Sequence, residues 1–286
     1  MEQFFKISKD GLEAVLCYPS SKSGYYRGTR FDWSGVFRKI SRCGHVYADT
    51  WFDGNNPTRH DNVCGPSEEF VIFKNDKPGT FLKIGVGLLK KESGPYDRFK
   101  YYEIVDEGTR SLEIGRNLAV FRHCMQGQYE YEKRVEIIDG NAMDIKHCLR
   151  NLSPSVLDTY VYNHNFFNLD NEIVGPNIRI DFPYEPYGTW REKLSEVTIK
   201  GKSIVFSSEL KEGGKSPFIG DLSSCQDFSF RIVNSVSGIS VEAFVDLPVE
   251  YSVFWGNHRV CCVEPYVHLT VLPGSEISWT NKYSFS

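Results

Sequence analysis

The sequence lacks several features that would place it in a functional class directly. It has no run of basic residues, and 33 lysines and arginines stand against 37 aspartates and glutamates, which gives a formal charge of −4. This balance argues against nucleic acid or an anionic membrane surface as a partner. No stretch approaches the roughly 18 consecutive apolar residues of a membrane span. The segment Met1–Ser20 has acidic residues near its start and no uninterrupted apolar core, so it does not resemble a secretory signal, and we expect a cytoplasmic protein.

Metal-binding and catalytic motifs are also missing. The eight cysteines are dispersed over 286 residues without C-x-x-C spacing, which fits neither a disulfide-stapled mini-domain nor a zinc ribbon. We therefore expect free and mostly buried thiols. The motifs H-E-x-x-H and G-x-S-x-G are absent, so the sequence gives no support for a zinc protease or a serine hydrolase. Ligands that are distant in sequence could still gather round a metal.

Strand signals recur along the chain, whereas helix signals are scarce. From Glu69 onward, short segments rich in β-branched and aromatic residues alternate with Gly, Pro, Asn and Asp at intervals of about 10 to 15 residues. No amphipathic helices lie between them, and no linker-like segment divides the chain. The pattern predicts an all-β fold, a large antiparallel β-sandwich formed as a single domain over residues 1–286.

Two predicted strands carry unusual chemistry on one face. Side chains alternate across a strand, so Tyr160–Phe167 has one row formed by Tyr160, Tyr162, His164 and Phe166. The opposite row is Val161, Asn163, Asn165 and Phe167. In Arg259–Pro273 the unusual row is Cys262, Glu264, Tyr266, His268 and Thr270. These rows suggest a groove in which rings contact the apolar faces of a sugar while polar groups bind its hydroxyls.

A structural role for these residues has to be weighed beside the catalytic one. A single histidine in a strand is more often structural than catalytic, and a single glutamate on a sheet face is usually solvated. Only convergence of His164 and Glu264 on one groove would make them a general acid and base. Alternation alone leaves both readings open.

Four segments in order resemble the second half of the aldose 1-epimerase (galactose mutarotase) family. They are YNHNFFNLD at 162–170, DFSFRIVN at 227–234, LPVEYSVFWGN at 247–257 and VCCVEPY at 260–266. The resemblance implies a large antiparallel β-sandwich, with His164 as general acid and Glu264 as general base. It implies substrate-binding roles for Asp227, although Phe228 replaces the usual histidine, and for Asn257.

The first half departs from the family pattern, which has an N-R-I segment and then an H-G-G segment. Here the corresponding stretches are YYRGTRFDWSGVF at 25–37 and NNPTRHDNVCGPSEEF at 55–70. Arg30, Arg59 and His60 are the candidates for the missing groups, and Glu68 or Glu69 could contribute. Alternatively, GTRFDWSG is simply a turn and strand in which Arg30 pairs with Asp32.

The resemblance implies an enzyme that interconverts the α and β anomers of a monosaccharide or sugar derivative. Glu264 would remove the anomeric proton while His164, as an imidazolium, protonates the ring oxygen. We expect the two to face each other across a cleft about one sugar ring wide, with Tyr162, Trp255 and Tyr266 against the sugar. This chemistry demands no metal or cofactor, and a monomer or homodimer would suffice.

Two other functions stay open. The first is a non-catalytic carbohydrate-binding β-sandwich. The second is a glycan hydrolase or lyase on the same fold, although hydrolases generally need two carboxyl groups at a defined separation, and only Asp227 is available as a second acid.

Overall fold

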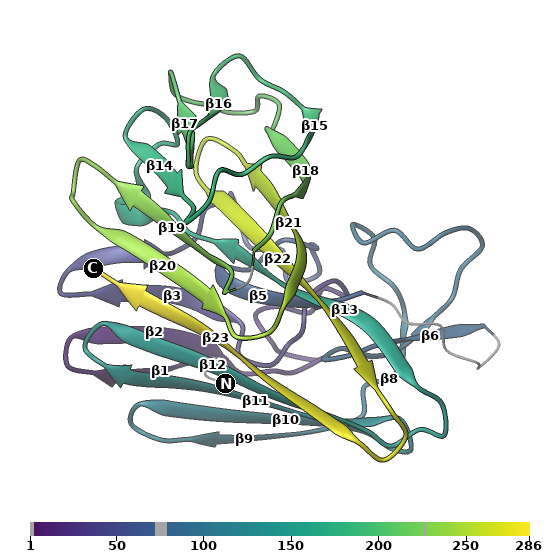
Figure 1. Ribbon diagram of the computed structural model, residues 1–286. Helices are drawn as coiled ribbons and strands as arrows, with labels where there is room; N and C mark the ends of the chain where they lie inside the picture. Colours follow the sequence, from purple (N-terminus) through teal and green to yellow (C-terminus); the bar gives the residue numbers. More distant parts are fainter. Residues whose placement is uncertain (1–2, 72–78, 226) are drawn as a thin grey trace.

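The computed structural model describes residues 3–71, 79–225 and 227–286, and these form four antiparallel sheets (Figure 1). The ten-stranded sheet contains, in spatial order, β16 (Val197–Lys200), β17 (Ser203–Phe206), β14 (Ile178–Asp181), β19 (Ser229–Asn234), β20 (Ser240–Val245), β23 (Glu276–Phe285), β12 (Ala142–Asn151), β11 (Tyr129–Asp139), β10 (Leu118–Met125) and β9 (Thr109–Ile114). The six-stranded sheet contains β15 (Thr189–Glu192), β18 (Phe218–Leu222), β21 (Val249–Gly256), β22 (Cys261–Val271), β13 (Leu157–Phe166) and β5 (Gly65–Phe70).

Two smaller sheets come from the first half of the chain. One contains β1 (Phe4–Lys9), β2 (Leu12–Cys17), β3 (Phe37–Arg42) and β4 (His45–Ala48). The other contains β6 (Thr80–Lys83), β7 (Gly87–Lys90) and β8 (Ile104–Asp106). A short 3₁₀ turn, η1 (Leu169–Asn171), follows β13. Among the described residues, no helix is long and apolar enough to cross a membrane.

The six-stranded and ten-stranded sheets pack face to face and enclose the main core. Phe70 of β5 lies edge-on against Tyr131 of β11 and Trp279 of β23, with ring centroids 5.3 and 6.2 Å apart. The amide of Asn281 donates a hydrogen bond of 2.7 Å to Asn163, and Tyr283 donates one of 2.9 Å to Asn165. These contacts join β23 to one face of β13. The predicted all-β fold and antiparallel sandwich are thereby confirmed.

The sequence analysis did not predict β1 to β4, because it found strands only from Glu69 onward, and it also missed β8 to β10, β15 and β18. A local signal was present: Asp10 and Gly11 join β1 to β2 with φ of 47° and 89°. Positive φ at both central residues is the geometry that Asp-Gly favours in a two-residue hairpin. The first predicted strand, which begins at Glu69, runs on into residues 72–75, outside the described residues.

A layer of buried polar groups crosses the core between the two large sheets. Lys133 of β11 is buried, and its ammonium contacts the carboxylate of Glu68 and donates a 2.8 Å bond to the carbonyl of Ser34. Glu68 also accepts a 2.7 Å bond from the amide of Asn163, and His147 lies 3.7 Å away. The buried charges are thus paired, as stability requires.

The Glu68–Lys133 pair generates a stability prediction. Lys133→Met is expected to destabilise the protein by about 3–5 kcal/mol, because it leaves a carboxylate buried without its cation. Urea denaturation followed by circular dichroism measures this. The control is Lys146→Met, whose 2.9 Å pair with Glu136 is half exposed, and a change below about 1 kcal/mol is expected there. Adding Glu68→Gln to Lys133→Met removes the unpaired carboxylate and should restore part of the lost stability. If the double variant is no more stable than Lys133→Met, the broken ion pair does not cause the destabilisation.

Candidate active site

Six of the ten predicted site residues converge on the face of the six-stranded sheet that points away from the ten-stranded sheet. This face is covered by segments of the first half of the chain and holds a cavity of about 210 Å³. The volume is below the roughly 300–1,000 Å³ usual for drug-sized ligands, so it suits a small molecule. The lining residues are Arg30, Trp51, His60, Asp61, Arg98, Phe99, His164, Phe166, Phe218, Val253, Trp255, Glu264 and Tyr266.

His164 and Glu264 are in direct contact in this cavity. Tyr162 of β13 pairs with Tyr266 of β22, and continuing this register by two residues puts His164 opposite Glu264. The Nε2 atom of His164 lies 3.1 Å from Oε1 of Glu264, and the side chains are only 6% and 5% exposed. The imidazole is stacked on Phe166 at 3.8 Å, so both groups are held in place.

This contact corrects the expected separation of about one sugar ring. The two oxygens of a hemiacetal that exchange protons, the anomeric hydroxyl and the ring oxygen, are bonded to the same carbon. An acid and a base that serve them can therefore be immediate neighbours on one side of the ring, as His164 and Glu264 are.

Burial shifts the pKa values of the pair in opposite directions. It raises the pKa of the Glu264 carboxyl to about 7, although the positive charges of Arg30 and Arg98 act against this rise. Burial, and to a smaller extent the same two arginines, lower the pKa of His164 well below its usual range. The resting imidazole is therefore neutral, and the expected imidazolium is disfavoured. Nδ1 of His164 is buried and has no hydrogen-bond partner among the described residues.

Beside the pair, Glu69 of β5 gathers three cations. Its buried carboxylate accepts bonds of 2.7 Å from Arg30 and 3.0 Å from Lys83, with Arg98 3.9 Å away. The hydroxyl of Tyr162 also donates to it. Burial alone would raise the pKa of Glu69, but the three cations and this hydroxyl lower it to about 2. Arg30 thus pairs with Glu69 rather than with Asp32, and it holds the N-terminal segment against the sheet.

Arg98 was not found from the sequence. Its guanidinium donates a 3.1 Å bond to the hydroxyl of Tyr162, and it lies 3.4 Å from that of Tyr266. These two phenol rings stack with centroids 4.2 Å apart. Arg98 lies in the connection between β7 and β8, where no periodic pattern indicates which side chains point inward. Trp51, Asp61, Phe99, Phe218 and Val253 were also missed.

Four predicted binding residues lie outside the cavity lining, and one of them is Tyr162, which is buried behind it with its hydroxyl bonded to Glu69. Asp227 is exposed and immediately precedes the Phe228–Ser229 entry to β19, a strand of the ten-stranded sheet rather than of the six-stranded one. Asn257 caps a turn, because its side-chain oxygen accepts hydrogen bonds of 2.8 and 3.0 Å from the backbone N–H groups of Arg259 and Val260. Arg59 pairs with the carboxylate of Asp61. His60 and Trp255 do line the cavity.

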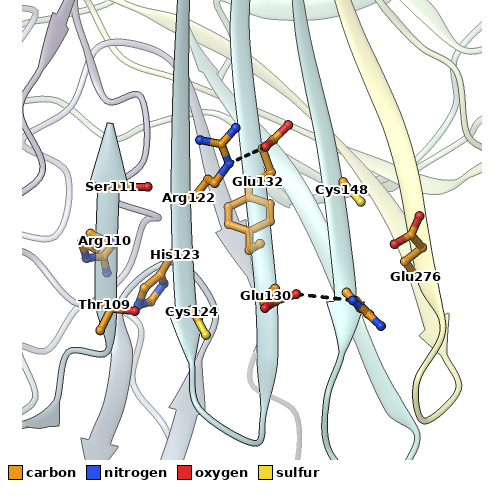
Figure 2. A pocket seen from close by; sticks show the side chains of 12 residues that line it. Thr109, Arg110, Ser111, Arg122, His123, Cys124, Glu130, Glu132, Cys148 and Glu276 are labelled. Carbon is orange, nitrogen blue, oxygen red and sulfur yellow. Dashed lines mark hydrogen bonds and ion pairs between the residues drawn. The ribbon is translucent and has the colours of Figure 1, made fainter. Parts of the chain in front are cut away.

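A larger hollow of about 650 Å³ lies on the ten-stranded sheet, around β9 to β12 and β23 (Figure 2). Two ion pairs cross it: Arg122 bonds to Glu132 at 2.7 Å, and Arg150 lies 3.8 Å from Glu130. None of the predicted site residues lines it. Within the described residues, no group of three or more His, Cys, Asp or Glu side chains is placed to hold a metal ion.

No family model matches the chain, and no curated protein matches its sequence. Solved structures do match along nearly the whole chain. The Slr1438 protein from Synechocystis aligns with 12% identity and a TM-score of 0.60, covering 100% of this chain and 96% of the other. A galactose mutarotase-like protein from Lactobacillus casei aligns with 10% identity and a TM-score of 0.58, covering 99% and 100%. An aldose epimerase homologue from C. elegans aligns with 12% identity and a TM-score of 0.54, covering 99% and 98%.

The chain has a galactose mutarotase-like fold. The family resemblance seen in the second half of the sequence is thus confirmed at the level of the fold, and the alignments extend it to the first half. At 10 to 12% identity the likeness concerns the fold alone, so activity has to be argued from the site.

The raised pKa of Glu264 predicts how stability depends on pH. The folded chain holds this proton up to about pH 7, whereas the ordinary pKa is 4.5, so folding binds a proton between these values. The stabilisation is complete below pH 4.5 and is lost as pH rises through 7, a change of about 3 kcal/mol. Glu264→Gln removes this titration, so its stability relative to wild type should increase by about that amount between pH 4.5 and pH 8.

Urea denaturation at both pH values measures this difference. The matched control is Glu250→Gln on β21 of the same sheet, where the side chain is exposed and no such change is expected. Parallel curves for wild type and Glu264→Gln would contradict the assignment of a raised pKa to Glu264.

Proposed function

We propose that this protein is an aldose 1-epimerase-like isomerase that interconverts the α and β anomers of a sugar by acid and base catalysis. The observation that carries the proposal is the buried contact between His164 and Glu264, 3.1 Å apart, in a small cavity walled by aromatic rings. The galactose mutarotase-like fold supports it, because some of the similar structures carry epimerase names.

The pair holds one transferable proton, which is enough for both halves of the reaction. With the proton on Glu264, Nε2 of His164 accepts the proton of the anomeric hydroxyl. The bond from C1 to the ring oxygen breaks, its electron pair goes to that oxygen, and Glu264 protonates it. The open aldehyde rotates about the C1–C2 bond. Ring closure then proceeds with Glu264 as base and the imidazolium of His164 as acid, which restores the starting proton.

The cavity walls suit a sugar substrate. Trp51, Phe166 and Trp255 contact one another around His164, with Trp51 stacked on Phe166 at 5.1 Å. Such rings pack against the apolar faces of pyranoses, whereas polar groups fix the hydroxyls. A hydrolase has less support, because Glu69 is engaged by cations, Asp61 of the cavity lining is paired with Arg59, and Asp227 lies outside the lining. All eight cysteines are free, which suits the reducing cytoplasm.

Mutarotation of freshly dissolved sugar tests the proposal. Polarimetry on α-glucose and α-galactose should show faster equilibration with protein than in buffer, and a panel of pentoses, deoxy sugars and acidic sugars extends the test. His164→Asn and Glu264→Gln should each lower kcat by about 10²- to 10⁴-fold. The matched controls, His268→Asn and Glu250→Gln, lie on the same sheet outside the cavity lining and should retain activity. A wild type no faster than buffer on every sugar would refute the proposal.

The rate should also depend on pH. As pH rises through about 7, Glu264 gives up the proton of the pair to solvent, and neither side chain can then protonate the ring oxygen. We expect kcat/KM, corrected for the buffer reaction, to be level below pH 7 and to fall about tenfold per pH unit above it. Anomer exchange measured by NMR gives this profile. A rate that rises above pH 7 would mean that the ionised carboxylate acts without a proton on its partner.

A further inference from the structure

Positive charge exceeds negative charge around the candidate cavity. Arg30, Lys83 and Arg98 all lie within 4 Å of one carboxylate, that of Glu69. The other cavity acid near the mouth, Asp61, is already paired with Arg59. One buried carboxylate therefore serves three cations, although buried charges are ordinarily paired one to one.

The carboxyl group of Glu264 does not neutralise this excess of positive charge. Its polar contacts within 4 Å are with His164 and the hydroxyl of Tyr266, and no arginine or lysine of the described residues forms an ion pair with it at that distance. Its carboxyl keeps a raised pKa of about 7 even with Arg30 and Arg98 nearby. The cavity thus retains an excess of at least one positive charge when the sugar enters.

Arg98 lines the cavity and is the most exposed of the three cations around Glu69. Its side chain is 32% exposed, compared with 6% for Arg30 and 0% for Lys83. Its distance of 3.9 Å to Glu69 is too long for a hydrogen bond, and the bonds it makes go to phenol hydroxyls. A guanidinium presents five donors in a planar fork that matches a carboxylate or a phosphate, so Arg98 has donors to spare.

The position of Arg98 indicates which end of a sugar would meet it. It contacts Tyr162 and Tyr266, each of which is two residues along its strand from His164 and Glu264. Nη1 of Arg98 lies 3.4 Å from the hydroxyl of Tyr266, and this hydroxyl lies 3.5 Å from Oε2 of Glu264, so Arg98 and Glu264 are close neighbours on one side of the cavity. In a pyranose the exocyclic carbon is bonded to C5, next to the ring oxygen that Glu264 serves, so a charged group on that carbon lies on the side of Arg98.

Resting on the proposed epimerase function, we propose that the substrate is an anionic monosaccharide, whose carboxylate or phosphate on the exocyclic carbon binds Arg98. The aromatic walls then contact the ring, and the anion balances the excess charge beside Glu69. Carboxylate and phosphate share the chemistry that a guanidinium recognises, and the choice between them is left to experiment.

The test compares three sugars that differ at the exocyclic carbon: glucose, glucuronic acid and glucose 6-phosphate. Anomer exchange is measured by NMR magnetisation transfer, and binding by calorimetry. A charge-assisted bond is worth about 1.5–3 kcal/mol, so at least one anionic sugar should have a kcat/KM about 10- to 100-fold above that of glucose. Which anionic sugar is preferred identifies the group. The preference should shrink at high salt.

Variants connect the preference to Arg98. Arg98→Gln should raise KM for the preferred anionic sugar about 10- to 100-fold and remove its advantage over glucose. Arg98→Lys, which keeps the charge but loses the planar guanidinium, should retain part of the preference for the anionic sugar. The matched control Arg150→Gln removes an exposed arginine of the ten-stranded sheet and should keep the full preference.

The outcomes separate this inference from the proposed function. Equal kcat/KM for glucose and both anionic sugars would overturn the anionic substrate and leave the epimerase intact. Tight, Arg98-dependent binding of an anionic sugar without faster anomer exchange would support the anion site and refute the epimerase. A preference that survives in Arg98→Gln would overturn the role of Arg98.

Discussion

The carboxylate of Glu69 is the interaction on which the arrangement of the cavity depends. It joins Arg30 from the N-terminal segment, Lys83 from β6 and Tyr162 from β13, three parts of the chain that are distant in sequence. Because all four groups are buried, none of these bonds is exchanged for water without a cost of several kcal/mol. The segments that cover the six-stranded sheet are therefore fixed on it by charge as well as by apolar packing.

Strand alternation gives the six-stranded sheet two different polar faces. Glu68 and Glu69 are neighbours in β5, yet one meets Lys133 in the core and the other faces Arg30 beside the cavity. In the same way Asn163 bonds to the ten-stranded sheet while His164 contacts Glu264. Glu68 pairs with Lys133 of β11, and Asn163 and Asn165 bond to Asn281 and Tyr283 of β23, so β5 and β13 are anchored from the core side.

The sequence predicted those parts of the structure that a local pattern determines. The period of two placed His164 in a row with Tyr162 and Phe166, and ordered motifs led to Glu264. The pattern could not reveal Arg98 or the pairing of Arg30 with Glu69, because loop side chains follow no period and their partners are chosen by the tertiary fold. Asp227 was assigned by motif alone, and its strand belongs to the other large sheet. A single domain over residues 1–286 stays a prediction.

The contact between His164 and Glu264 also has a consequence for selectivity. Nε2 of His164 and Oε1 of Glu264 are in contact, and a molecule that enters between them has to offer each a new hydrogen-bond partner. A ligand that supplies only an acceptor, or only a donor, leaves one buried polar group unsatisfied at a cost of about 1–3 kcal/mol. A hemiacetal offers both on a single carbon, whereas an alkyl glycoside has lost its hydroxyl proton. If the proposed function holds, this contact favours a free reducing end before any bond is broken.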